Sequence, residues 1–574
     1  MNKKFSRRNF LKTTTASSLL LSTTNPLGVL FHQIMDSTAH AQTAQAKRFI
    51  SFVILGAPPR WMFDLILDVG DIPPDVNAMT STSFHSETGV PIYKTTSSTY
   101  QTSDGINFNP PAIWDSALGD GDSNFMPQLL TKMMSIRAVR TIGNHPPAKL
   151  STHVHSFSKA GVHTLAQEQG NNNAPASCVQ YGVNFPFNAR NEISNLTVKY
   201  DDSEGFNPIE EILRPFLKEH TPDKDFSSSL GDIFDEAFNA FFKGDKIKTF
   251  SDGAKDSIKS SQQNAKLLFI GATKDLINSY PNILTKYKSA ITNQMNNNGH
   301  LPEVPLPENN SGLNEKYHFR PDTSYTMDNS GNFKTLNDVY SGENTNLDQM
   351  ASSFAVAEIL SQSNGSGVLS QGITNSMVFY LGQLKIYSAH AHTNGVFSNQ
   401  PHYNDAHNIG SYPTTFGFTK YYQCFSQCLK LLITSFGGMN SEKFRNTLIQ
   451  LSGDFNRTPR DDEAGSDHAS EGVFTYFGGA INGPLLGGAC KVNTKSNWQD
   501  YGQSYFDETM DKNETHTVPK LSSIHCFEGV AKFLGVPKLT NSVEPCFTFS
   551  NGAFSIHPKF IAKNYDVSTD EEES

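Results

Sequence analysis

Three apolar runs in the 574-residue chain predict strands of a parallel sheet. The first, RFISFVILGAPPR at 48–60, is almost continuously apolar, as strands buried on both faces are. MVFYLGQLKIY at 377–387 and TLIQLS at 447–452 have the same character. Polar residues follow each run, at the position where α/β proteins place ligands at the carboxyl edge of a sheet. The pattern predicts an α/β fold.

The pattern changes between about 204 and 346. Apolar and charged positions alternate with a helical period at 208–220, 230–242 and 265–287. A stretch rich in Pro and Asn then runs from about 293 to 346. A connection of this length is unusual within a compact domain and is typically functional, disordered or a lid. The sequence therefore predicts a helical and Pro/Asn-rich insertion at about 204–346.

The first 41 residues have the features of a twin-arginine export signal. SRRNFLK at 6–12 carries Arg7 and Arg8, and a short apolar stretch follows it. AHA at 39–41 offers the small residues that signal peptidase needs, so the mature chain is expected to begin near Gln42. This predicts a periplasmic or extracellular protein whose partner during export is the twin-arginine translocase. The alternative is a basic amino terminus without an export function.

Composition and charge narrow the class of protein. Hydrophobic residues make up 37% of the chain and aromatic residues 11%, enough for a large core. Residues 1–41 hold five of the 46 basic residues and one of the 56 acidic ones, which leaves 41 against 55 and a net charge of −14 in the mature chain. Such a chain is a poor candidate for binding nucleic acid. No segment of the mature chain is apolar over the roughly 18 residues that a transmembrane helix needs, and residues 566–574 form an acidic tail.

The six cysteines give no disulfide pairing by themselves. Their even number in an exported chain permits disulfides, but sequence alone does not say which residues pair. Cys424 and Cys428 lie four residues apart in a helical pattern and so share a helix face. No further soft ligands at a zinc-like spacing accompany them, so buried or disulfide-bonded thiols are the better interpretation.

Metal-ligand residue types follow the second and third strands. HAHTNG supplies His390 and His392, two residues apart, which point the same way in an extended chain. GDFNRTPR places Asp454 at the end of the third strand, and GSDH then supplies Asp467 and His468. These residues are hard or borderline metal ligands at a sheet edge, so they predict a divalent-metal site. Their ligand atoms are expected to lie within about 6 Å of a common point. The alternative is that they are polar residues of ordinary loops.

Two arginines and a Thr-Pro pair follow Asp454. Arg457 and Arg460 are candidates for an anion clamp, because guanidinium binds oxyanions in a fork geometry. Salt bridges to the acids at 461 and 462 explain them equally well. The pair at 458–459 also fits the start of a helix, with Thr as its cap and Pro at its first position.

These residues carry a family resemblance. TLIQLSGDFNRTPR, GSDH and FGGAINGPLLGG resemble the carboxyl-terminal signature of a large bacterial family of unknown function. Its members carry twin-arginine signals and belong to the alkaline phosphatase/sulfatase-like superfamily. The similarity covers nearly the whole mature chain outside the insertion, including ILGAPPRWMFD at 54–64, NHPPAKLSTHVHSFSKAG at 144–161 and SSIHCFEGVAKFLGV at 522–536.

The resemblance implies a three-layer α/β/α fold with a mostly parallel sheet, as one domain over residues 42–565. It also implies a divalent cation (zinc, calcium or magnesium) at the carboxyl edge of the sheet, near Asp454, Asp467 and His468. In active superfamily members such cations polarise a phosphate or sulfate ester, and a Ser, Thr or Cys after the first strand attacks it. The implied substrate is a small anionic ester.

The first turn departs from this pattern. Pro59 and Trp61 or Met62 stand where the family commonly has Ser and Asp, and the nearest carboxylate is Asp64. No Ser, Thr or Cys occurs between residues 56 and 78, so the usual nucleophile is missing. Two functions therefore remain open: a metal-dependent ester hydrolase with a degenerate nucleophile position, or a non-catalytic binding or assembly protein on the same fold.

The export signal gives a first testable prediction. Replacing Arg7 and Arg8 together by Lys should leave the precursor unprocessed in the cytoplasm, because the pathway reads the arginine pair. Fractionation and immunoblotting of cells that express the variant measure this. Mature, exported variant at the normal level would contradict the assignment.

Overall fold

The computed structural model describes the following parts of the chain. Described are residues 47–56, 58–60, 62–66, 83–84, 91–92, 98–103, 105–141, 161–162, 165, 178–183, 195–213, 252–296, 326–327, 333–334, 347–362, 372–387, 401–403, 411–454, 457–459, 466–468, 471–488, 521–536 and 543–561.

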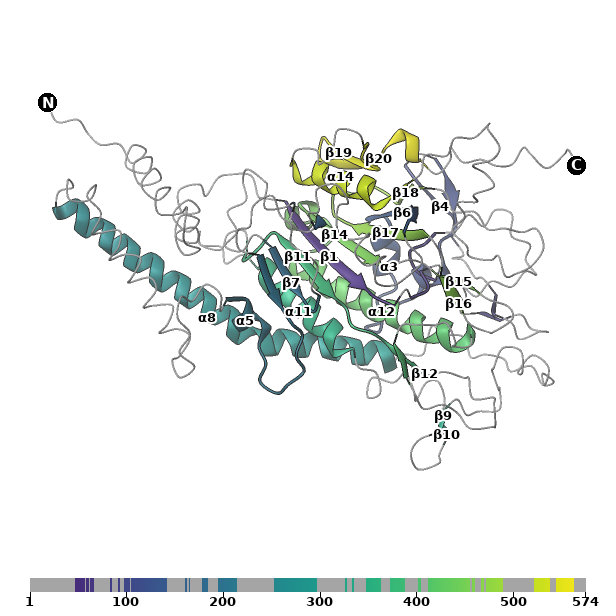
Figure 1. Ribbon diagram of the computed structural model, residues 1–574, viewed down its shortest axis with the longest axis horizontal. Coiled ribbons are helices and arrows are strands. Elements are labelled where there is room, and N and C mark those ends of the chain that lie inside the picture. Colours follow the sequence, from purple (N-terminus) through teal and green to yellow (C-terminus); the bar gives the residue numbers. More distant parts are fainter. Residues whose placement is uncertain are drawn as a thin grey trace, which may run out of the picture.

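A mixed, mostly parallel sheet of eight strands lies at the centre (Figure 1). In sheet order the strands are β18 (Leu485–Gly487), β6 (Met133–Arg140), β17 (Glu471–Phe477), β14 (Thr447–Gly453), β1 (Arg48–Ile54), β11 (Ser376–Tyr380), β7 (Cys178–Tyr181) and β8 (Asn195–Val198). Only β17 runs against the others, since it pairs antiparallel with both β14 and β6. The three strands β14, β1 and β11 are parallel neighbours, so their carboxyl ends meet at one edge.

The side chains of β1 show that both faces of the sheet are covered. All seven residues of β1 are buried. Ile50 and Phe52 join one hydrophobic cluster, whereas Phe49 joins another on the opposite face. This alternation follows from the two-residue period of a strand. It explains why the sequence of β1 is almost continuously apolar.

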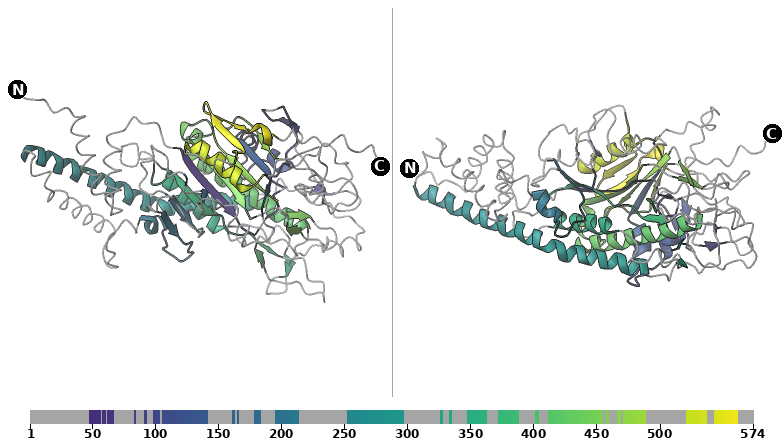
Figure 2. Two further views of the ribbon diagram at one scale, coloured as in Figure 1. Left: turned by 45° about the horizontal axis from the view of Figure 1, so that its top comes forward. Right: turned by 60° about the horizontal axis from the view of Figure 1, so that its bottom comes forward.

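Helices cover the two faces. They are α3 (Phe125–Leu130), α5 (Pro208–Leu213), α8 (Asp252–Asn296), α11 (Asp348–Ser361), α12 (Ser411–Ser435), α13 (Glu442–Arg445) and α14 (Ser523–Leu534), with 3-10 turns η1 (Ala112–Asp115) and η5 (Pro558–Phe560). Figure 2 shows α14, in yellow, on one side of the sheet and α8 and α12, in teal and green, on the other. The described part of the chain is therefore an α/β fold, as the sequence predicts.

The described residues also form six two-stranded antiparallel pairs outside the main sheet. They are β2 (Ser83–Phe84) with β3 (Pro91–Ile92), β4 (Tyr100–Gln101) with β5 (Asn107–Phe108), β9 (Thr326–Met327) with β10 (Phe333–Lys334), β12 (Lys385–Tyr387) with β13 (Pro401–Tyr403), β15 (Arg457–Pro459) with β16 (Ser466–His468), and β19 (Phe547–Ser550) with β20 (Ala553–Ile556).

Two sequence predictions need correction. The apolar run 377–387 is not one strand, because β11 ends at Tyr380 and Gly382 adopts a φ of 76° before β12 begins. The pair Thr458–Pro459 does not start a helix, because both residues belong to the strand β15. Proline suits the edge of so short a pair, where no ladder hydrogen bond is required of it.

The predicted insertion contributes to the core. Tyr287 and Met295, in the carboxyl-terminal half of α8, are fully buried in the main hydrophobic cluster. Glu358 of α11 accepts hydrogen bonds from the Lys286 ammonium at 2.7 and 2.6 Å and from the Tyr287 hydroxyl at 2.6 Å. Lys420 of α12 donates to the Met295 carbonyl, where the negative end of the helix dipole of α8 favours a cation. These contacts fix α8 against α11 and α12, two helices that cover the sheet.

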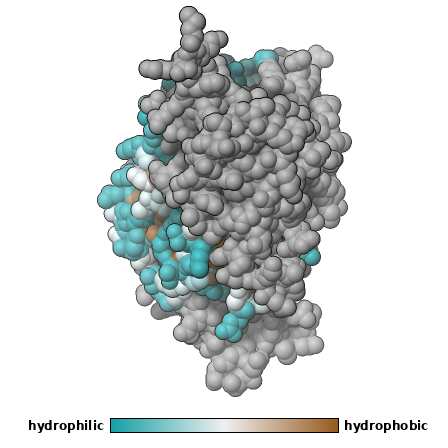
Figure 3. Space-filling view, turned by 90° about the vertical axis from the view of Figure 1, so that its left-hand side faces the viewer, coloured by the Kyte–Doolittle hydropathy of each residue, from teal (hydrophilic) through white to brown (hydrophobic). Residues whose placement is uncertain are grey.

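On the face in Figure 3 the described residues are mostly hydrophilic, with small separate apolar spots. Among the described helices, none combines the length and hydropathy needed to cross a bilayer.

Pro281 lies inside α8 and leaves one carbonyl without its usual helical donor. In a regular helix the amide of residue 281 would bond to the Ile277 carbonyl, and proline has no amide hydrogen. The Asn207 side-chain amide donates to that carbonyl instead, at 3.0 Å. The Asn207 carbonyl oxygen meanwhile accepts from the Ile209 amide at 3.0 Å and so caps α5. The Asn207 side chain thus supplies hydrogen-bond partners to two backbone groups that have none within their own helices, the Ile277 carbonyl and the Ile209 amide.

A double-mutant cycle tests this compensation. Asn207→Asp keeps the acceptor that caps α5 but cannot donate to Ile277, so it should cost about 1–3 kcal/mol of unfolding free energy. In a Pro281→Ala background the amide of residue 281 can donate to the Ile277 carbonyl. The loss of unfolding free energy caused by Asn207→Asp should then be smaller by roughly 1 kcal/mol. Urea unfolding of the four proteins measures both values. Equal costs in the two backgrounds would show that Asn207 does not replace the missing helical donor.

Candidate functional site

The carboxyl ends of β1 and β14 form the polar centre of the sheet edge. Asp454 follows β14 directly, and its side chain is only 3% exposed. The Gly56 amide, two residues after β1, donates to the Asp454 carboxylate at 3.3 Å. Gly56 has a φ of 93°, a conformation that side-chain-bearing residues rarely adopt. The turn after β1 therefore aims a backbone donor at the carboxylate at the end of β14.

Burial keeps protonated both Tyr380, whose pKa also responds to the charge of Asp454, and three thiols elsewhere in the fold. Tyr380 ends β11, and its pKa is raised by burial and by the negative charge of Asp454. Burial also raises the pKa of the Cys178, Cys424 and Cys428 thiols. At neutral pH none of these groups is an ionised nucleophile, since each favours its neutral form.

A buried ion pair occupies the segment after β1. Arg60 and Asp64 are 2% and 0% exposed, and the Arg60 Nε donates to the Asp64 carboxylate at 2.7 Å, with Nη2 donating to its second oxygen. Burial would lower the pKa of Arg60, but the Asp64 carboxylate offsets this and the pKa is raised. Nη2 also donates to the Leu451 carbonyl of β14 at 3.3 Å. Both carboxylate oxygens of Asp64 are thus hydrogen-bonded to the Arg60 guanidinium.

The carbonyl groups of the same segment accept donors from three other elements. Tyr422 of α12 donates to the Pro59 carbonyl at 2.9 Å, and Trp114 of η1 donates to Phe63 at 2.6 Å. Two residues of β6 complete the set: Ser135 donates to the Asp64 carbonyl at 2.8 Å, and Arg137 donates to that of Ile66. Buried backbone without secondary structure needs such partners. They hold the segment in one conformation.

Aromatic rings pack around the described part of the turn after β1. Phe63 stacks between Trp114 and Tyr422, with ring centroids 5.0 and 4.8 Å apart and interplanar angles of 9° on both sides. Pro59 and Met62 are buried as well. The described residues of this turn are core side chains, so the turn offers packing and no attacking group.

The hairpin of β15 and β16 continues from this edge. β14 leads through Asp454 to β15, and β16 leads back to β17. The backbone register pairs Arg457 with His468 and Thr458 with Asp467. Figure 1 shows this hairpin beyond the arrowhead of β1. The chain therefore carries Asp467 and His468 to the same edge of the sheet as Asp454.

The predicted site residues are described to different extents. Asp454 is described in full and lies at the predicted edge. Arg457, Asp467 and His468 are described as strand backbone. The remaining predicted residues, His390, His392 and Arg460, lie outside the described residues. Within the described residues no three His, Cys, Asp or Glu side chains gather as metal ligands. The predicted convergence of the five ligands thus stays a prediction.

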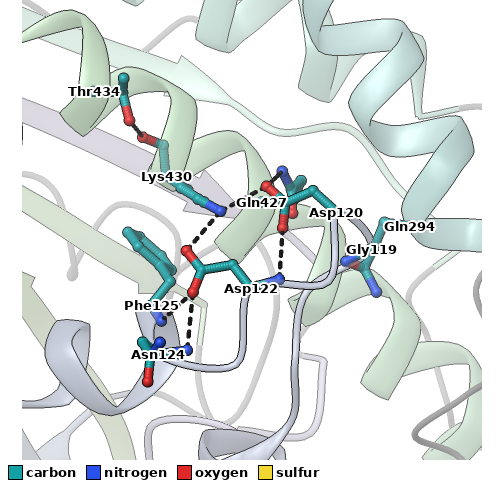
Figure 4. Close-up of polar contacts among 9 residues, drawn as sticks. All are labelled: Gly119, Asp120, Asp122, Asn124, Phe125, Gln294, Gln427, Lys430 and Thr434. Carbon is teal, nitrogen blue, oxygen red and sulfur yellow. Dashed lines mark hydrogen bonds and ion pairs between the residues drawn. The ribbon is translucent and has the colours of Figure 1, made fainter.

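One acidic pair that could resemble a cation-binding loop is neutralised within the chain (Figure 4). The Lys430 ammonium lies 2.6 Å from an oxygen of Asp120 and 2.8 Å from one of Asp122. The pKa of Asp120 is lowered, because hydrogen bonds from Lys430 and Gln427 outweigh the effect of its burial. Asp122 also accepts from the Asn124 amide at 2.9 Å. This pair holds a loop against α12 and is not a metal candidate.

Sequence reasoning missed the pairing of Arg60 with Asp64. A four-residue spacing of opposite charges was the available signal, since such pairs meet across one helical turn. The surrounding sequence, PPRWMFD, contains two prolines and no helical period, so the spacing carries little weight by itself.

Comparisons with protein-family models, with curated proteins and with solved structures found no match to this chain. The resemblance to the alkaline phosphatase/sulfatase-like superfamily therefore stays a prediction.

The Arg60–Asp64 pair gives a stability prediction. Arg60→Met or Asp64→Leu alone leaves one buried charge without its partner and should cost about 3–5 kcal/mol. The double variant removes both charges and should recover most of that loss. Chemical denaturation measures all three variants. As a control, Lys288→Met removes one partner of the exposed pair with Asp348 and should change stability by less than about 1 kcal/mol.

A double variant as unstable as the worse single variant would contradict this interpretation. That result would mean that the guanidinium fork is needed for its bond to Leu451, independently of Asp64.

Proposed function

We propose that this protein is an exported member of the alkaline phosphatase/sulfatase-like superfamily that binds a divalent cation at the carboxyl edge of its sheet. Any ester hydrolysis by it proceeds without a covalent intermediate on the protein. The observation that carries the proposal is the buried Asp454 carboxylate at the end of β14, beside the turn after β1. Open α/β sheets bind ligands at this edge.

The export proposal rests on the amino-terminal motif. SRRNFLK, the apolar stretch after it and AHA at 39–41 occur in the order of a twin-arginine signal. The proposed location is the periplasm or the extracellular space, reached through the twin-arginine translocase. This route carries folded proteins, so a cation can be acquired before export.

The proposed ligands are His390, His392, Asp454, Asp467 and His468. Arg457 comes three positions after Asp454, a reach of at most about 11 Å, and it pairs with His468. The donor set combines carboxylates with imidazoles. Imidazoles favour zinc, whereas carboxylates by themselves suit magnesium or calcium.

The proposed ligand set assigns a role to each group of residues. A bound cation would polarise a phosphate or sulfate ester. Arg457 and Arg460 are proposed to hold the anionic group of a small ester substrate through their guanidinium forks. The turn after β1 contributes shape and the Gly56 donor to Asp454, and no nucleophile.

A second candidate function is a non-catalytic exported binding or assembly protein. The observation that favours it is the turn after β1, where Asp64 is committed to Arg60 and Phe63 is stacked between two rings. In this case the cation has a structural role only.

Metal analysis of protein purified without chelator tests the proposed site. Wild-type protein should contain a divalent metal, and Asp467→Ala should lose it and melt at a lower temperature, because clustered ligands repel without their cation. Asp462→Ala, an acid from the same stretch that is not a proposed ligand, is the matched control and should keep the metal. Metal-free wild-type protein that does not take up zinc, magnesium or calcium would overturn the proposed site.

Turnover of aryl phosphate and aryl sulfate esters separates the two functions. Slow hydrolysis that disappears with the metal supports the hydrolase, and bound metal without hydrolysis supports the binding protein. No phosphoenzyme should form in either case. A covalent phosphoryl adduct between Gly56 and Ala78, or rapid turnover after complete metal removal, would contradict the proposed chemistry.

A further inference from the structure

Two cysteines on the face of the sheet opposite α8 lie in contact. Cys526 belongs to the first half of α14, and Cys546 directly precedes β19. Their sulfur atoms are 3.7 Å apart and both side chains are fully buried. The Cys546 amide also donates to the His525 carbonyl at 3.0 Å, which holds the two backbone segments together. A disulfide bond of about 2.05 Å requires the two sulfur atoms to approach by a further 1.6–1.7 Å.

The packing around Cys526 and Cys546 holds α14 against the start of β19. An added Cβ at Gly529, one turn further along α14, would lie 2.7 Å from the Phe547 ring. The glycine therefore allows α14 to lie directly on the residue that follows Cys546. Phe547 in turn packs edge-on against Tyr476 of β17, with ring centroids 5.0 Å apart. The helix, the hairpin and the sheet thus hold the two sulfurs in place.

The other described cysteines are arranged differently. Cys424 and Cys428 lie one turn apart on α12, and the Cys424 thiol donates to the Ile291 carbonyl of α8 at 3.8 Å. Parallel side chains on successive turns do not have the Cβ geometry of a disulfide. Cys178 lies in the interior strand β7. Among the described cysteines, only Cys526 and Cys546 have sulfur atoms in contact.

We propose that Cys526 and Cys546 are a site of oxidative modification, at which a thiol–disulfide oxidant forms a disulfide that joins α14 to the β19–β20 hairpin. One thiolate attacks a sulfur of the oxidant's disulfide, which forms a mixed disulfide and releases one thiol of the oxidant. The second thiolate then attacks the protein sulfur of the mixed disulfide and releases the other thiol. The two cysteines lose two protons and two electrons, and the oxidant's disulfide gains them.

Burial controls when this reaction occurs. It raises the pKa of the Cys546 thiol, so the folded protein exposes little thiolate. Exchange therefore requires local opening of α14 or takes place before α14 packs. The reducing cytoplasm keeps the thiols reduced, whereas an oxidising compartment outside it favours the disulfide. The closed loop of 20 residues restricts the unfolded chain and stabilises the carboxyl-terminal layer. None of these residues belongs to the proposed metal site, so the inference stands apart from the proposed metal binding; in the cell it rests on the proposed export.

Peptide mapping of the full-length protein tests the proposal. The protein is incubated with oxidised glutathione in urea below its unfolding midpoint, which permits local opening, and then alkylated under full denaturation. The expected product is a peptide pair linked through Cys526 and Cys546, lighter than the two thiol peptides by about 2 Da, the mass of two hydrogen atoms. Cys178, Cys424 and Cys428 should be alkylated throughout.

Thermal melting provides a second measurement. Oxidised protein should melt several degrees above the reduced protein, since the cross-link is retained in the unfolded chain. Cys526→Ala with Cys546→Ala should abolish the difference, and Cys424→Ala with Cys428→Ala should keep it. Failure of Cys526 and Cys546 to cross-link under these conditions, or a link from either to another cysteine instead, would overturn the proposal.

Discussion

The architecture depends on satisfying the buried backbone that follows β1. Residues 58–66 have few regular backbone partners, yet their described side chains are buried, so their carbonyl groups need donors from elsewhere. Side chains of α12, η1 and β6 supply these donors, and the Arg60 guanidinium connects the segment to β14. Elements that are distant in sequence are thereby fixed around one turn. The same turn sets the position of Gly56 beside Asp454, so the geometry of the candidate site follows from this requirement.

The parallel strands were predictable because a strand that is buried on both faces has an almost continuously apolar sequence. β1 and β14 coincide closely with apolar runs, and α8 lies where a helical period is visible. The break between β11 and β12 was not predicted, since the run remains apolar across Gly382. Thr458 and Pro459 fit a helix start and a strand equally well in local terms. Their pairing with β16 decides the outcome, and such a pairing is not local information.

The candidate site was predictable only in part. The position of Asp454 follows from the end of an apolar strand. The commitment of Asp64 to Arg60 could not be predicted, because it depends on burial and on rings contributed by Trp114 and Tyr422 from other elements. In the same way, the role of Asn207 depends on a proline more than 70 residues away. Contacts of this kind arise from the tertiary structure and leave no periodic pattern in the sequence.

The place of β1 in the sheet has a consequence for the timing of folding. β1 lies in the interior of the sheet, yet its neighbours β11 and β14 come more than 300 residues later in the chain. At 5–20 residues per second, a ribosome needs about 20–80 s to make the roughly 400 residues between β1 and β14. Until β11 is made, roughly 320 residues after β1, this seven-residue and mostly apolar strand has neither of its neighbours in the sheet. Productive synthesis must therefore keep this segment from aggregating until the carboxyl-terminal half emerges, and the protein gains its central sheet only late in translation.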